Sequence, residues 1–206
     1  MPDDSKAMKL VNYLVDHAID GVPPLSGCES LAQEYRIDQS YDDDDHRVKS
    51  LIRWEMSKNF TSGFITGLGG LITLPIAIPA ALTASWIVQA RMSGAIACIY
   101  GHSINEDRVR TLVLLSLLGD AVKEPLKQAG IKVGTKITAQ VFEAIPGKVL
   151  IAINKAVGFR LITKAGQTGI VNLVKIVPVV GGAVGGTVDA WACSTVGDAA
   201  QKIFRP

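Results

Sequence analysis

Residues 61–90 read TSGFITGLGGLITLPIAIPAALTASWIVQA and contain no charged side chain. Thirty uncharged residues exceed the roughly 20 that cross a bilayer as a helix. Two prolines, Pro75 and Pro79, and four glycines lie inside the stretch, which argues against one straight span. We therefore expect two apolar helices, over about residues 62–72 and from Pro75 or Pro79 to about Tyr100. Together they form a glycine-rich central hairpin that faces a protein core, a lipid or both.

The rest of the chain carries helical patterns on both sides of this stretch. Apolar residues recur at three- and four-residue steps from Met8 to Ile19, and Gly21 with two prolines ends that pattern. No convincing strand pattern occurs. Further helices are predicted over residues 29–37, 46–60, 106–118, 132–144, 147–164 and 179–204, with a break at Gly166. The sequence thus predicts an all-α fold, a compact multi-helix bundle around the apolar hairpin.

Charge divides the chain into two parts. Residues 1–46 carry eleven acidic and three basic side chains, whereas residues 47–206 carry eight acidic and eighteen basic ones. We expect an acidic N-terminal helical segment over residues 1–46 and a helical domain over residues 47–206. The basic bias is strongest between Lys132 and Lys175, where Glu143 is the only acid. Such a region suits anionic lipid head groups, and it equally suits the acidic N-terminal segment.

Pairs of glycines spaced four residues apart predict close helix packing. Such faces allow two helix backbones to touch, either within this protein or between two membrane helices. The pairs are Gly63 with Gly67, Gly181 with Gly185, and Gly182 with Gly186. Three tryptophans, Trp54, Trp86 and Trp191, are either packing residues or anchors at a membrane interface.

Motifs for the common catalytic chemistries are missing from the sequence. It contains neither a G-x-S-x-G nucleophile turn nor an H-E-x-x-H zinc motif, and its three histidines are far apart. The scattered Cys28, Cys98 and Cys193 predict no disulfide framework or zinc site and favour a reducing compartment. We interpret Asp42–Asp45 as a solvated helix cap. We expect no metal, no cofactor and no nucleic-acid partner.

Several segments, taken in their order along the chain, resemble the EcsC protein family over residues 47–206. They include TSGFITGLGG at 61–70 with LITLP at 71–75, QAR at 89–91, ACIYG at 97–101, INK at 153–155 and GFRL at 158–161. Residues 108–115, 132–136 and 175–182 continue the match, as do Gly186 and Asp189. The family is named after a protein encoded beside an ABC transporter in bacteria. The resemblance implies a largely helical domain without agreed catalytic residues.

The resemblance also singles out polar positions in apolar surroundings, which need partners because burying an unpaired polar group costs about 1–3 kcal/mol. They form either a network that specifies the fold or a ligand site. The candidate residues are Gln89, Arg91, Asn154, Lys155, Arg160 and Asp189, and we add Lys164, which lies on the same predicted helix as Asn154.

These patterns predict a non-enzymatic helical domain that associates with membranes or binds lipid. Acyl chains or the bilayer would meet the apolar centre, and Arg91, Lys155, Arg160 and Lys164 would attract anionic head groups. We expect a cytoplasmic protein, peripheral at the inner face of the membrane. Two alternatives stay open. One is an enzyme with a site around Arg91, Asn154, Lys155 and Asp189. The other is a subunit that binds a membrane protein of a transporter system.

Overall fold

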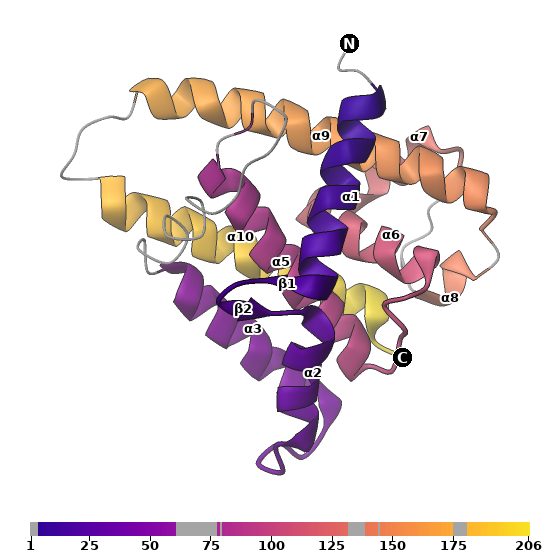
Figure 1. Cartoon of the computed structure of the whole chain (residues 1–206), viewed down its shortest axis with the longest axis vertical. Helices are drawn as coiled ribbons and strands as arrows, with labels where there is room; N and C mark the ends of the chain where they lie inside the picture. Colours follow the sequence, from indigo (N-terminus) through magenta and orange to yellow (C-terminus); the bar gives the residue numbers. More distant parts are fainter. Residues whose placement is uncertain (1–3, 61–77, 79, 132–138, 144, 175–180) are drawn as a thin grey trace.

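The computed structural model describes residues 4–60, 78, 80–131, 139–143, 145–174 and 181–206 (Figure 1). In this part of the chain the fold is all-α, as predicted, with one small hairpin of strands β1 (Gly21–Val22) and β2 (Leu25–Ser26). The helices are α1 (Asp4–Asp20), α2 (Cys28–Ile37), α3 (Asp44–Phe60), α5 (Ala80–Ile99), α6 (Asp107–Ser116), the short 3-10 helix η1 (Gly119–Val122), α7 (Lys123–Gln128), α8 (Ala139–Phe142), α9 (Gly147–Val174) and α10 (Gly181–Phe204).

Helix α5 forms the centre of the molecule. Every residue from Thr83 to Ile99 is buried, and α1, α2, α3, α6 and α10 all pack against this helix. A helix that is apolar nearly all round must be covered in this way to stay in water. The C-terminal part of the uncharged stretch is therefore protein core. The predicted hairpin partner, residues 62–72, lies outside the described residues.

Two helix pairs flank this centre. Helix α3 packs along α10 in antiparallel orientation, because Asp45 near the start of α3 pairs with Arg205 beyond the end of α10, and Ile52 lies against Gly197. Helix α1 crosses α9, and the two backbones nearly touch there. A Cβ atom added to Gly158 would lie 2.5 Å from the carbonyl oxygen of Ala7.

The predicted helix break at Gly166 is wrong, because α9 continues from Gly147 to Val174. A single glycine costs about 1 kcal/mol inside a helix and keeps its backbone N–H, so the hydrogen-bond ladder can pass through it. Proline is the residue that removes this donor, and Pro178 lies beyond the end of α9.

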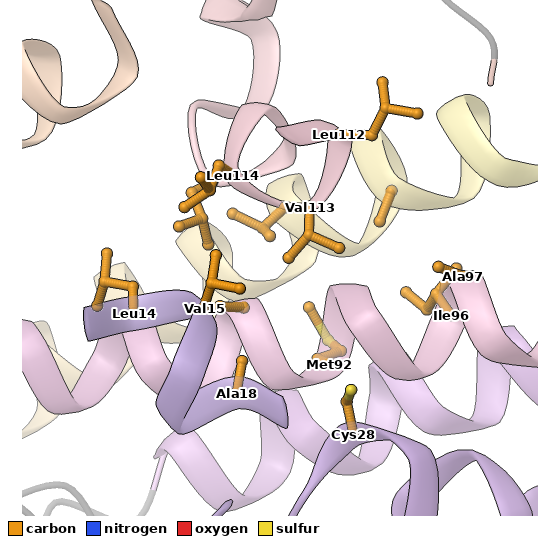
Figure 2. Packing of buried hydrophobic residues seen from close by; sticks show 14 of the residues in the cluster. Leu14, Val15, Ala18, Cys28, Met92, Ile96, Ala97, Leu112, Val113 and Leu114 are labelled. Atoms are coloured by element: carbon orange, nitrogen blue, oxygen red, sulfur yellow. The ribbon is translucent and has the colours of Figure 1, made fainter. Parts of the chain in front are cut away.

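One hydrophobic core joins the N-terminal helices to the rest of the described chain. Figure 2 shows Leu14 of α1 and Cys28 of α2 among side chains of α5, including Met92 and Ile96. All four of these side chains are fully buried. The structure thus places residues of the acidic segment, 1–46, in the same core as residues of the predicted domain 47–206.

Within the described ranges, none of the helices combines the length and the apolar character that crossing a bilayer requires.

Candidate functional site

Arg91 forms a buried ion pair, which explains how a charged side chain is tolerated in the apolar helix α5. Its side chain on α5 is 3% exposed, and Nη1 donates a hydrogen bond to Oε1 of Glu55 on α3 at 3.3 Å. Its Nη2 donates to the Ser26 hydroxyl at 3.1 Å, and its Nε donates to the Ser26 carbonyl. Burying two ions is tolerated when they pair and their other polar atoms find hydrogen bonds. Arg91 therefore joins α5 to α3 and to the β-hairpin.

Gln89 also lies inside the core. It is 4% exposed, and its Nε2 donates to the Ser85 hydroxyl one turn earlier on α5, at 3.1 Å. For Gln89 and Arg91, these contacts support the fold-specifying network over the ligand site. Both side chains are too deeply buried to reach a head group on the surface.

The basic residues of α9 are placed differently, at the surface. Helix α9 contains Lys148, Lys155, Arg160 and Lys164 and no acidic residue. Lys155 Nζ donates to Oδ2 of Asp4 at 2.8 Å, and Arg160 Nη2 lies 3.6 Å from Oε2 of Glu124. Exposed ion pairs of this kind contribute only about 0–1 kcal/mol, so an anionic ligand can replace the carboxylate at little cost.

A cavity of about 280 Å³ lies between α1, α6 and α9. Val15, Leu114 and Leu150 line it with buried apolar side chains. Asn154 on α9 and Thr111 on α6 also line it, and their Oδ1 and Oγ1 atoms are buried without a hydrogen-bond partner among the described residues. Other polar lining residues are Asn12, Asp16, Asp107 and Arg110.

The predicted site residues thus separate into three places: the core, the surface of α9 and this cavity. Asp189 belongs to α10, but its side chain lies outside the described residues. Thr111 was not identified as a site residue from the sequence. It lies among apolar residues of α6, and their periodicity alone indicates a core position there. In the described part of the chain, no three His, Cys, Asp or Glu side chains lie close enough together to hold a metal ion.

The close helix contacts also differ from the glycine pairs. Gly181, Gly182, Gly185 and Gly186 lie in the first turns of α10, and their packing stays a prediction. Gly63 and Gly67 lie outside the described residues. In the described helices, close contacts instead occur at glycines without a glycine partner four residues away, among them Gly158 against Ala7 and Gly197 against Ile52.

Marked pKa shifts occur at three places away from the cavity. Burial is the largest cause that raises the pKa of Tyr35 to about 12. Burial and a hydrogen bond to Asp45, 2.7 Å from the phenol oxygen, raise the pKa of Tyr100 to about 12. A hydrogen bond between the Cys28 and Cys98 thiols lowers the pKa of Cys98 and raises that of Cys28, which burial raises further. Cys28 and Cys98 are therefore unequal thiols.

These features define an all-α domain built around a buried apolar helix, with an internal arginine–glutamate pair and, at its side, a cavity lined by both polar and apolar residues. The model of the EcsC protein family matches residues 9–206, so the chain belongs to that family. The match begins within α1, well before the residues 47–206 over which the sequence segments showed the resemblance. Neither the curated proteins nor the solved structures yielded a match.

Proposed function

We propose that this chain is a non-enzymatic helical domain that associates with anionic membrane surfaces and binds lipid there. The observation that carries the proposal is the placement of four helix ends. In Figure 1 the end of α3, the start of α5, the end of α9 and the start of α10 lie toward the left side of the molecule. The segments between these ends, 61–79 and 175–180, have apolar sequences whose single charge is Lys175.

Two exposed tryptophans lie on α3 and α10, helices that reach this side of the molecule. Trp191 on α10 is 68% exposed and Trp54 on α3 is 57% exposed, whereas Trp86 is a core residue with 2% exposure. Tryptophan is enriched where protein meets the head-group region of a bilayer. Trp54 and Trp191 are therefore the tryptophans to which we assign an anchoring role.

Positive charge lies on α9, the helix that leads to this side. Arg160 and Lys164 follow its crossing with α1 at Gly158, toward the end at Val174. Each basic residue near an anionic leaflet contributes about 1 kcal/mol of attraction. Lys155 is a weaker candidate, because it lies before the crossing and therefore farther from this side. Arg91 has no part in this surface.

The alternative of an enzyme around Arg91, Asn154, Lys155 and Asp189 gains no support from the geometry. Arg91 contacts Ser26 and Glu55, Asn154 lines the cavity, and Lys155 pairs with Asp4. The three described side chains do not converge on one reacting centre.

Co-sedimentation with vesicles tests the proposal. We expect binding to vesicles rich in phosphatidylglycerol, weaker binding to pure phosphatidylcholine, and release as salt rises through the range where the Debye length falls from ~10 to ~3 Å. The double variant Arg160→Gln/Lys164→Gln loses about 2 kcal/mol of attraction, which corresponds to roughly thirty-fold weaker partitioning.

The matched control is Lys202→Gln, which neutralises an exposed lysine at the other end of α10, near the C-terminus. Its partitioning should equal that of the wild type. Equal binding to both kinds of vesicle, binding to neither, or an equal loss in the control would contradict the proposal.

A further inference from the structure

Two residues that line the cavity between α1, α6 and α9 have side-chain oxygens without a partner in the described part of the chain. Thr111 is fully buried, and its Oγ1 makes no hydrogen bond within the described protein, nor does the buried Oδ1 of Asn154. Buried polar atoms almost always have a partner, and leaving one without a partner is costly. Both residues line the same cavity from different helices, so one molecule with several donors could serve both oxygens.

The charges around the cavity favour a positively charged molecule. Asp16 of α1 and Asp107 of α6 are exposed residues that line it, against one basic residue, Arg110. Arg110 Nε donates to the carbonyl oxygen of Ile104 at 3.0 Å, and its one positive charge leaves the two carboxylates in excess. Oxygen acceptors and carboxylates therefore dominate the polar part of the lining.

The size and the apolar lining limit what else the ligand carries. A volume of about 280 Å³ lies at the lower end of the ~300–1,000 Å³ range of small-molecule sites. The buried side chains of Val15, Leu114 and Leu150 offer a surface to a short aliphatic segment. A complete lipid with its acyl chains exceeds this space.

We propose that this cavity binds a primary ammonium group carried on a short aliphatic segment. An ammonium group has three donors and no acceptor, which matches a lining that offers the Thr111 and Asn154 oxygens and two carboxylates. Hydrogen bonds to a charged donor are shorter and stronger than those between neutral groups. The aliphatic segment packs against Leu114 and Leu150. This site does not depend on the proposed membrane association.

Two sources can present this chemistry, a soluble alkylamine or the ethanolamine head group of a lipid. The soluble probe is propylammonium chloride, titrated calorimetrically into the full chain. Tetramethylammonium has the charge but no N–H donor, and propionate has the size but the opposite charge. The lipid arm compares vesicles of phosphatidylcholine with vesicles that also contain phosphatidylethanolamine.

Two variants remove the unpartnered oxygens one at a time. Thr111→Val and Asn154→Leu replace a polar group by an apolar one of similar size, so each variant should fold and keep or raise its melting temperature. Lys155→Gln, next to Asn154 on α9 but outside the cavity lining, is the matched control. Thr111→Val alone decides the question if Asn154→Leu fails to fold.

We expect propylammonium or the ethanolamine vesicles to bind, with at least ten-fold weaker binding in Thr111→Val and unchanged binding in Lys155→Gln. Binding of the free amine assigns a soluble ligand, and binding of the vesicles alone assigns the lipid head group. The proposal is overturned if neither probe binds, if tetramethylammonium binds as well as propylammonium, or if Thr111→Val binds like the wild type.

Discussion

The crossing of α1 and α9 offers the sharpest test of how this fold is packed. A methyl group added at Gly158 would lie 2.5 Å from the Ala7 oxygen, 2.9 Å from its carbonyl carbon and 3.0 Å from its Cα. These are backbone atoms, so no side-chain rotation can relieve the overlap. Carbon–oxygen contacts normally lie at about 3.3–3.6 Å. The variant Gly158→Ala therefore forces α1 away from α9 by about 0.8–1.1 Å.

The expected loss of stability follows from two opposing contributions. Overpacking in a close-packed interior costs about 1–3 kcal/mol, and contact with rigid backbone places this case near the upper end. Alanine returns up to about 1 kcal/mol through its better helix propensity. The free energy of unfolding should fall by about 1–2 kcal/mol. Urea titration followed by far-ultraviolet circular dichroism measures the change, and amide exchange in α1 should increase with it.

The matched control is Gly147→Ala on the same helix. A Cβ atom at Gly147 would have no atom within 4 Å, so the stability of this variant should change by less than about 0.5 kcal/mol. The steric reasoning is refuted if Gly158→Ala is as stable as the wild type, or if the two variants lose equal stability.

Three further predictions concern the buried charges and the shifted ionisations. Glu55→Gln leaves the guanidinium of Arg91 buried without a counter-charge, so urea unfolding should show a loss of about 3–5 kcal/mol, and adding Arg91→Met should recover part of it. Because folding raises the pKa of Tyr100 from 10.0 to about 12, the unfolded chain ionises first as the pH rises, and stability falls between these two values. Tyr100→Phe should remove that part of the alkaline loss and lower the late-rising tyrosinate absorbance, to which Tyr35 also contributes because burial raises its pKa to about 12. An unchanged absorbance curve would contradict the shift. Thiol alkylation in the folded protein should reach Cys98 before Cys28, since only the pKa of Cys98 is lowered, and mass spectrometry of the modified peptides would show the reverse order if this reasoning is wrong.

The local sequence pattern was sufficient to predict where most helices lie. The three- and four-residue spacing from Met8 to Ile19 predicted α1, and the glycine and prolines after it predicted its end at Asp20. The absence of charge before Arg91 predicted that α5 would face apolar surroundings. Such features depend on residues that are close together in the chain, so the sequence displays them directly. The break expected at Gly166 shows the limit, because a glycine permits a helix to end but does not require it.

Contacts between residues far apart in the sequence could be identified only from the tertiary structure. Arg91 pairs with Glu55, 36 residues away, and with Ser26, 65 residues away, and no local pattern connects these positions. Tertiary packing also brings Gly158 against Ala7. It likewise places Thr111 and Asn154 around one cavity. Composition and periodicity determined that the chain is helical and that α5 must face apolar surroundings, either protein or lipid. Only the packing of helices far apart in sequence decided that protein covers α5 and that Thr111 and Asn154 line one cavity between α1, α6 and α9.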